Sequence, residues 1–408
     1  MPGEDLSRRT NILCLEQFSS LGGGQLCLLD LLPGLVNRGW QAMVAVPGEG
    51  PFSAAVRALG IPVTALRESA YKNKRSRGRF AEYSFDLQSA ARAILRMART
   101  HRADLLYVNG TRLFPPAALI GRLLSIPVIL HCHNRLLERT AIRLVGNSLR
   151  FARGHLISCC RSTAIPLSSY IHSDHFSVIY NGIAGFPQRK PAASVPRTIG
   201  IVGRIERDKG QLEFVRAARL IRDQFPNVRF FIIGAPLFRG SEYLERVKLA
   251  GQGLPVEFAG WQNDIGAVLS NLDLLVVPST QVDSTPRVIL EAFSAGVPVV
   301  AFPSGGIPEI LKDDETGFLT TASTPQALAD RIASVLMMPH TQLNSTIRRA
   351  RQSWQEHFTL DRYQQQVTRV IGEVLSGAKQ KPAGTLDNGR QKSAKVMPGT
   401  GQNQAIIR

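Results

Sequence analysis

The sequence is poor in cysteine, in acidic residues relative to basic ones, and in long apolar runs. Its five cysteines are odd in number and include no Cys-x-x-Cys pair, which predicts the reduced thiols of a cytoplasmic protein rather than a disulfide framework. No stretch approaches the roughly 18 uninterrupted apolar residues of a transmembrane helix. The sequence therefore predicts at most a peripheral contact with a membrane.

The 408 residues, 44% of them hydrophobic, are enough for two ordinary domain cores. Positive charge is spread unevenly along them. Residues 1–190 hold 24 Lys/Arg against 11 Asp/Glu, residues 191–377 hold 19 against 19, and the remainder holds 6 against 1. A basic excess of this kind attracts nucleic acid, anionic lipid or phosphorylated substrates, and composition does not choose among them.

Residues 283–311 have the sequence DSTPRVILEAFSAGVPVVAFPSGGIPEIL, the pattern of a turn, a helix, a strand, a glycine turn and a second helix. Ser284 and Thr285 are suited to cap the first helix. The glycine turn leaves no Cβ in the way of a ligand. Asp283 precedes the first helix and Glu291 lies within it, so we expect two carboxylates to point towards one cleft, because a buried helix rarely carries a carboxylate without a partner.

A second motif, TIGIVGRIERDKG, predicts a strand that ends at Gly203, followed by a short loop and a helix. Arg204 and Lys209 flank the loop. Two cations at the end of a strand, beside the N-terminus of a helix, suit a diphosphate. Surface charges in an ordinary polar loop are the alternative.

The start of the chain repeats the strand, glycine turn and helix pattern. NILCLEQF predicts a strand, and a turn containing Gly22 and Gly23 leads into a helix. This is the phosphate-binding start of a Rossmann-like unit. A tight turn without a ligand explains the glycines equally well, because glycine is the usual residue wherever φ must be positive.

Two histidines alternate with a cysteine in the strand IPVILHCHN. His131 and His133 should therefore point to one side at the carboxyl end of the strand, where open α/β sheets bind their ligands. Zinc is a possible ligand, with Cys159 and Cys160 as further donors. Structural zinc sites normally show spaced Cys-x-x-Cys or His-x-x-x-His pairs, so the sequence favours a site without metal.

Positive charge in the first half is concentrated in one polar stretch and two helices. The stretch YKNKRSRGRFAEY predicts a loop that contacts an acceptor or lipid headgroups, or one that is merely solvated. The helices carry arginines at helical spacing, which predicts a basic stripe. The residues concerned are Lys72, Lys74, Arg75, Arg77 and Arg79 in the loop, and Arg92, Arg96, Arg99, Arg139, Arg143, Arg150 and Arg153 on the helices.

Asp283, the seven residues before Glu291 and the following AFSAGVPVV resemble the acidic pair and helix of the retaining glycosyltransferases called family 4. The glycine and cation motif resembles the same family's Gly-Arg and Lys-Gly pattern. The chain departs from the family by having Asp283 where Glu is usual, and Thr285-Pro286 where Phe-Gly is frequent. These departures concern the donor sugar more than the nucleotide.

The resemblance implies an α/β protein with the GT-B fold, in which two Rossmann-like domains face each other and a C-terminal helix crosses back to the first. It implies a nucleotide-diphosphate sugar as donor and no required metal. Arg204 and Lys209 would hold the diphosphate and Glu291 the ribose. Asp283 would hold a sugar hydroxyl, and His133, with His131 in reserve, would lie beside the reacting carbon. Further donor-binding residues would be Gly22, Gly23, Arg287, Val288, Gly260 and Trp261, where Trp261 as core filler is the alternative.

We therefore expect a first domain at 1–187, a linker at 188–197, a second domain at 198–358, a returning helix at 359–375 and a disordered tail at 376–408. The expected activity is transfer of a sugar to a glycan or lipid-linked acceptor in cell-surface glycan synthesis. It would take place in the cytoplasm, on the anionic inner face of the plasma membrane, and without nucleic acid. A GT-B sugar-nucleotide epimerase and a basic nucleic-acid-binding protein are the alternatives.

Overall fold

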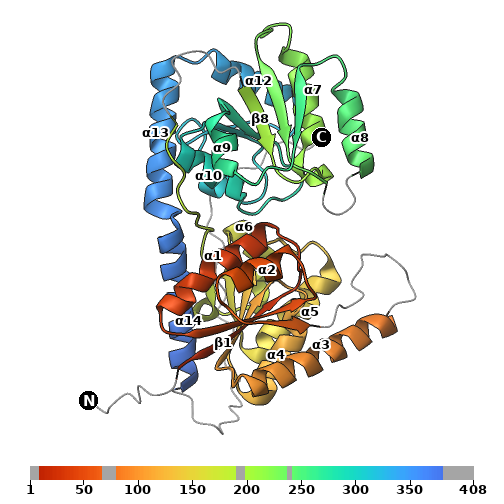
Figure 1. Cartoon of the computed structure of the whole chain (residues 1–408), viewed down its shortest axis with the longest axis vertical. Coiled ribbons are helices and arrows are strands. Elements are labelled where there is room, and N and C mark those ends of the chain that lie inside the picture. The colour runs from red at the N-terminus through yellow and green to blue at the C-terminus, as the bar shows by residue number, and fades with distance from the viewer. Residues whose placement is uncertain (1–8, 67–79, 190–197, 237–240, 380–408) are drawn as a thin grey trace, which may run out of the picture.

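The computed structural model describes residues 9–66, 80–189, 198–236 and 241–379. They form two α/β domains, one above the other in Figure 1, with two helices running along one side. The predicted basic loop, most of the predicted linker and nearly all of the predicted tail lie outside these residues.

The first domain is built on a seven-stranded sheet in which all neighbouring strands are parallel and the order is β3-β2-β1-β4-β5-β6-β7. The strands are β1 (Asn11–Glu16), β2 (Gln41–Pro47), β3 (Val63–Leu66), β4 (Leu105–Asn109), β5 (Val128–Cys132), β6 (His155–Ser158) and β7 (Phe176–Val178). Successive residues of β1 enter different cores, Ile12 on one face of the sheet and Leu13 on the other. Burial on both faces explains the nearly continuous apolar runs of these strands.

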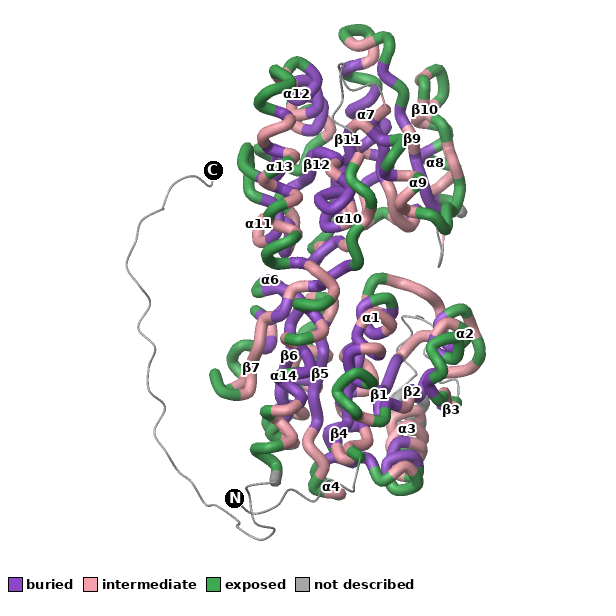
Figure 2. Tube along the Cα trace, turned by 60° about the vertical axis from the view of Figure 1, so that its left-hand side comes forward, coloured by how far each residue is buried: buried purple, intermediate pink, exposed green. Residues whose placement is uncertain are grey.

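Helices cover both faces of this sheet. The elements are α1 (Gly23–Asn37), α2 (Pro51–Ala58), α3 (Phe80–Thr100), α4 (Phe114–Leu124), α5 (Arg139–Ala152) and α6 (Arg161–Ala164). Helices α1 and α2 share one core with the sheet, whereas α3, α4 and α5 share the other. Figure 2 shows most strands of both domains as the buried centre between these layers.

The second domain repeats the plan with a six-stranded parallel sheet of order β10-β9-β8-β11-β12-β13. Its strands are β8 (Thr198–Val202), β9 (Arg229–Ile233), β10 (Val256–Gly260), β11 (Leu274–Val277), β12 (Val299–Ala301) and β13 (Phe318–Leu319). Its helices are α7 (Gln211–Ile221), α8 (Ser241–Ala250), α9 (Ile265–Ser270), α10 (Arg287–Ala295), α11 (Ile307–Ile310), α12 (Pro325–Leu336) and α13 (His340–His357). The core with α7, α8 and α12 lies on one face, and the core with α9 and α10 on the other.

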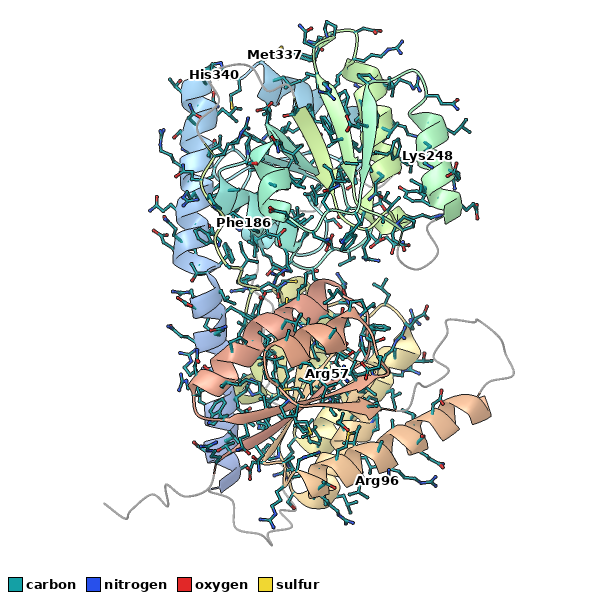
Figure 3. The ribbon with its side chains drawn as sticks, in the orientation of Figure 1. Arg57, Arg96, Phe186, Lys248, Met337 and His340 are labelled. Carbon is teal, nitrogen blue, oxygen red and sulfur yellow. The ribbon has the colours of Figure 1, made fainter. Side chains whose placement is uncertain are left out.

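The chain passes between the domains twice, and the two passages are bonded to each other. Ile183 donates its N–H to the Phe358 carbonyl and accepts from the Leu360 N–H, both at 3.0 Å. Gly182 permits this approach, since a Cβ there would lie 2.4 Å from the Thr359 carbonyl oxygen. Figure 3 labels Phe186 on the first of these passages, beside the second domain.

The last helix, α14 (Leu360–Lys379), leaves the second domain and packs on α1 of the first (Figure 1). Its Tyr363 is fully buried, and the phenol donates to the Cys27 carbonyl oxygen at 3.1 Å. Gln364 donates to the Asp30 carbonyl oxygen at 2.6 Å. Two parallel Rossmann-like sheets and a returning C-terminal helix confirm the predicted GT-B fold class.

Candidate functional site

Three of the predicted donor-binding residues of the second domain, Arg204, Lys209 and Gly260, lie where parallel strands end. Gly260 ends β10, and Arg204 and Lys209 follow β8. Two further residues at this edge are Gly203, directly after β8, and Ser279, two residues beyond β11. Gly203 and Gly260 have φ of +151° and +68°, which favour glycine, and an added Cβ would meet no atom within 4 Å at either. The carboxyl edge of the second sheet therefore has open space beside its backbone, as ligand sites of open α/β sheets do.

Lys209 and Asp283 form an ion pair at this edge. Lys209 Nζ lies 2.6 Å from Asp283 Oδ2, and the same oxygen accepts from the Ser279 hydroxyl at 2.8 Å. The side chains of Lys209 and Asp283 are 25% and 15% exposed, so the pair is partly screened from water. Arg204 is on the other side of the short loop, and its Nη2 lies 3.4 Å from Asp208 Oδ2. The structure thus joins two predicted residues, the cation and the first carboxylate, which are 74 positions apart.

The predicted capping by Ser284 and Thr285 is wrong. Helix α10 begins at Arg287, its N-cap is Pro286, and no side chain caps it. The Thr285 hydroxyl instead donates to the Cys159 carbonyl oxygen at 2.8 Å. The Ser284 hydroxyl accepts from Thr163 at 3.0 Å. Both hydroxyls join the two domains, because burial at the junction leaves polar groups no water to bond with.

The glycine turn after β12, with Gly305 and Gly306, was predicted to leave space for a ligand, and in the structure backbone fills that space. A Cβ at Gly305 would lie 2.0 Å from the Asp283 carbonyl oxygen, and one at Gly306 would lie 1.9 Å from that of Ser284. The space is taken by backbone and not left for a ligand. These glycines allow the segment that carries Asp283 to pass close by.

Arg287 and Glu291, on α10, lie against the first domain. Arg287 Nη1 is 2.7 Å from Asp30 Oδ2 of α1, and Arg287 Nε is 3.8 Å from Glu291 Oε1. Burial raises the pKa of Glu291 and of Asp30, and the Arg287 guanidinium opposes both shifts. The cation is therefore shared between two partly buried carboxylates from different domains.

On the first domain, His133 belongs to a network that the sequence did not reveal. Glu16 ends β1, Asn109 ends β4 and His133 follows β5, so three neighbouring strands present them at one edge. Glu16 and Asn109 are direct partners in the strand register. Asn109 Nδ2 lies 2.5 Å from Glu16 Oε2, and Asn109 Oδ1 lies 2.7 Å from His133 Nε2.

Burial dominates the acid–base behaviour of this network. It raises the pKa of Glu16 to about 7, while hydrogen bonds from Asn109, Gln25, Phe18 and Gln17 lower it. Burial also lowers the pKa of His133 to about 4, and the nearby Arg287 charge acts in the same sense. His133 is consequently a neutral imidazole at neutral pH.

His131 occupies a different environment, although the two rings stack with centroids 4.1 Å apart. It is fully buried, its Nδ1 lies against the Tyr107 hydroxyl, and its ring packs against Tyr363. Burial holds its pKa well below the usual value. Of the two histidines, His133 is the one that adjoins Arg287 and α1.

The remaining predicted residues differ in how they are placed. Gly22 is the N-cap of α1 and Gly23 its first residue, and a Cβ at Gly23 would meet nothing within 4 Å. Trp261 is 50% exposed and donates to Asn263 at 3.0 Å, so the core-filler alternative is wrong. Val288 is partly buried and packs on the core beneath α10.

Glu309, which the sequence analysis did not single out, connects the two domains through hydrogen bonds. Glu309 accepts from the backbone N–H groups of Arg161 and Ser162 at 2.8 and 2.9 Å and from the Tyr180 hydroxyl at 3.0 Å. Its own helix belongs to the second domain and the two N–H groups to the first. Within the described ranges, no three His, Cys, Asp or Glu side chains are grouped as metal ligands would be.

Comparisons with known proteins agree with this arrangement. Residues 196–338 match the family described as "Glycosyl transferases group 1", and residues 22–168 match the "Glycosyl transferase 4-like domain". The structure of Anabaena HepE in complex with UDP and glucose is similar with a TM-score of 0.74 at 23% identity, over 89% of this chain and 100% of that one. A lipopolysaccharide outer core galactosyltransferase, WaaB, gives a TM-score of 0.68 at 15% identity, over 89% and 99%.

Two curated relatives show how far the sequence similarity extends. A phosphatidyl-myo-inositol mannosyltransferase of Mycobacterium leprae is 25% identical over 349 residues, which is 80% of this chain and 87% of that protein. The putative colanic acid biosynthesis glycosyltransferase WcaL of Escherichia coli K12 is 27% identical over 198 residues, 46% of this chain and 47% of that protein.

Two Rossmann-like domains with polar groups at the strand ends where they meet, and a helix that returns to the first, define the GT-B fold. The chain belongs to the group 1 glycosyltransferases, the retaining family 4, and transfers a sugar from a nucleotide sugar.

Proposed function

We propose that the protein transfers a hexose from a nucleoside-diphosphate sugar to a lipid-linked or polysaccharide acceptor during synthesis of a cell-surface glycan. The observation that carries this is the position of Lys209 and Asp283 at one strand edge and His133 at another, with Arg287 joining their domains. The bond to be broken lies between the anomeric carbon and the diphosphate, so the site must take up negative charge on the leaving group.

Lys209 and Arg204 are suited to that task. Each follows the carboxyl end of β8, and a fixed cation in a partly buried site stabilises developing charge without reorganisation. Two cations make a metal ion unnecessary for this step. Because Asp283 pairs with Lys209, the diphosphate would share the ammonium with that carboxylate.

The carboxylates and His133 would orient the sugar nucleotide. Glu291 would accept from the ribose hydroxyls, since a carboxylate pairs well with a diol, and Asp283 would accept from a hydroxyl of the sugar. Val288, Gly260 and Trp261 would contact the nucleotide. Gly22 and Gly23 would lie beside the donor at the start of α1, and Gly23 has open space next to it. His133 would lie beside the reacting carbon. Because its ring is neutral, His133 would add no positive charge to those of Arg204 and Lys209.

An acceptor attached to lipid is favoured by the outer surface of the first domain. Helices α3, α4 and α5 pack side by side, and their exposed residues combine arginines with large apolar side chains. Leu123 is 63% exposed, and Figure 3 labels Arg96 on the outer side of α3. No helix among the described residues is long and apolar enough to span a bilayer. We infer that this face rests on the anionic inner leaflet of the plasma membrane.

The test is incubation with radiolabelled nucleotide sugars, with and without a lipid extract or capsular polysaccharide. Transfer of label to the acceptor, with an anomeric configuration that matches the donor by NMR, would support the proposal. Conversion of one sugar nucleotide into another without an acceptor would indicate an epimerase instead. Addition of EDTA should leave the rate unchanged.

A further inference from the structure

Asn109 lies between Glu16 and His133, and its surroundings fix the orientation of its amide. Nδ2 is 2.5 Å from Glu16 Oε2 and 3.0 Å from the Gly24 carbonyl oxygen, and both atoms are acceptors. Turning the amide over would place Oδ1 against these two oxygens. Nδ2 must therefore face Glu16 and Gly24, which leaves Oδ1 towards His133.

Glu16 is surrounded by donors alone. It is fully buried, and Oε1 accepts from the N–H groups of Gln17 and Phe18 and from Gln25 Nε2, at 2.7, 2.9 and 2.8 Å. Oε2 accepts from Asn109. A carboxylate satisfies all four donors, whereas a protonated carboxyl would turn its O–H against an N–H. The network is thus complete only with Glu16 as the acceptor at its start.

The orientation of Asn109 decides the tautomer of His133. Oδ1 only accepts, and it lies 2.7 Å from His133 Nε2, so Nε2 must carry the proton. A neutral ring then has its lone pair on Nδ1. Within the described residues, this Nδ1 is buried and has no hydrogen-bond partner. A buried acceptor without a partner is costly, which points to a partner that arrives with a ligand.

We propose that Glu16 and Asn109 are positioning residues that hold His133 in its Nε2–H tautomer, so that Nδ1 accepts a hydrogen bond from a hydroxyl of the bound donor sugar. Both act through His133. The identity of the ligand rests on the proposed function, whereas the tautomer follows from the protein's own contacts. Gly24 contributes by its size, because a Cβ there would lie 3.2 Å from His133 Cδ2.

The tautomer can be measured by NMR of the substrate-free protein labelled with 15N in its histidines. The His133 signals are assigned by their loss in His133→Gln. At about pH 8.5, above the pKa of about 7 to which burial raises Glu16, the carboxyl is ionised. The wild-type spectrum at that pH is expected to show a protonated Nε2 and a bare Nδ1. Glu16→Gln keeps the shape of the side chain but directs an N–H at Asn109 Nδ2. The amide of Asn109 is then expected to turn over and accept this N–H with Oδ1, at the expense of its hydrogen bond to the Gly24 carbonyl oxygen. The proton of His133 is expected to move to Nδ1 in this variant.

Kinetics separates positioning from a merely structural role. Glu16→Gln is expected to lower kcat by about 10-fold or more, the loss of roughly one hydrogen bond in the transition state. Its affinity for UDP, measured by calorimetry, should stay within about twofold of the wild-type value. Gln25→Met is the matched control: it removes another donor to Glu16 but leaves Asn109 in place, so the Nε2–H tautomer should persist.

A wild-type His133 with its proton on Nδ1 would overturn the proposal, as would a flipped tautomer with unchanged kcat. Persistence of the Nε2–H form in Glu16→Gln would remove Glu16 from the network. If that variant fails to fold, Asn109→Ala gives the same test, since the loss of Oδ1 should leave a mixture of tautomers. If no donor supports transfer, the proposed function and the sugar contact fail together, while the spectra still decide the tautomer.

Discussion

Arg287 and Asp30 form an ion pair that connects the two domains, with Nη1 and Oδ2 2.7 Å apart. Their side chains are 15% and 25% exposed, so the carboxylate of Asp30 depends on Arg287 for its charge compensation, whereas Arg287 also has Glu291 beside it. Glu291, 3.8 Å from the same guanidinium, is the carboxylate proposed to bind ribose. We therefore expect the contact between α10 and α1 to be coupled to the arrangement of the proposed donor site.

We expect Asp30→Asn to lower the free energy of unfolding by about 1–3 kcal/mol, because it leaves a buried charge short of a partner. In a double-mutant cycle with Arg287→Met, measured by urea denaturation, the coupling energy should be about 1–2 kcal/mol. Glu49→Gln is the control, since its pairing with Arg57 on the same domain is exposed and should matter little (Figure 3 labels Arg57). Additive effects of the two single changes would contradict the proposed link.

Lys209→Ala should weaken the binding of a nucleoside diphosphate, with UDP as the probe, by about 1.5–3 kcal/mol, the usual contribution of a charge-assisted hydrogen bond. Calorimetry measures this directly. Lys248→Ala is the matched control, because Lys248 lies on α8, is exposed and pairs only with its helix neighbour Glu245 among the ion pairs of the described chain. Equal affinities of the Lys209 variant and the wild type would remove Lys209 from the diphosphate site.

His133→Ala should reduce kcat far more than it reduces the affinity for UDP, because its proposed contact is with the sugar. His131→Ala should behave differently. It removes a fully buried ring packed against Tyr107 and Tyr363, so its main effect should be a loss of stability. Steady-state kinetics together with thermal unfolding distinguishes the two. A stable His131→Ala protein with a large loss of kcat would exchange the roles of the histidines.

Stability should fall as the pH is lowered from about 6.5 towards 4. Burial lowers the pKa of His133 and His155 to about 4 and that of His131 well below its usual value. The folded protein thus favours their neutral forms, and the stability they contribute is complete above about pH 6.5 and lost below it. The slope can reach roughly 1.4 kcal/mol per pH unit for each histidine.

Glu16 works in the opposite sense, because its pKa is raised to about 7. Its protonated form is favoured on folding, so its contribution is present below about pH 4.5 and is lost as the pH rises through 7. Urea denaturation at several pH values measures the free energy of unfolding and tests both directions of change.

His155 lies away from the site. The change His155→Gln should reduce the slope of stability against pH on the acid side, and an unchanged slope would contradict the assignment to His155.

The sequence made the second domain more predictable than the network around His133. Arg204 and Lys209 sit within one strand–loop–helix unit, so local spacing was enough to place them at a strand end. Glu16 and Asn109 are 93 residues apart and meet only because β1 and β4 pair in the observed register. In the predicted strand NILCLEQF, Glu16 was merely one of the polar residues.

Local rules also failed where the domains touch. Ser284 and Thr285 precede a helix, the position at which hydroxyls usually cap N–H groups. Thr285 instead bonds to Cys159, 126 residues earlier in the chain, because the junction buries a carbonyl oxygen that needs a donor. The spacing of these residues in the sequence does not indicate a contact across 126 positions.

The last prediction is that the first domain binds anionic membranes. The exposed side of α3, α4 and α5 carries arginines. Each arginine near an anionic leaflet contributes on the order of 1 kcal/mol to binding. Several acting together would therefore hold the protein at the membrane without a membrane anchor. Liposome co-sedimentation should show binding to phosphatidylglycerol vesicles that is lost at high salt. The arginines on these helices that are exposed are Arg92, Arg96, Arg99, Arg122, Arg139, Arg143 and Arg150.

Variants locate the binding face. Replacing Arg92, Arg96 and Arg99 by Gln should weaken binding, and neutralising the basic residues Lys72, Lys74, Arg75, Arg77 and Arg79 should weaken it further. The matched control replaces three exposed arginines of the second domain, Arg216, Arg246 and Arg348, and so removes the same charge from the other half of the molecule. If both triple variants lose binding equally, total charge and not this face is responsible. Binding to neutral vesicles as strong as to anionic ones would exclude an electrostatic surface altogether.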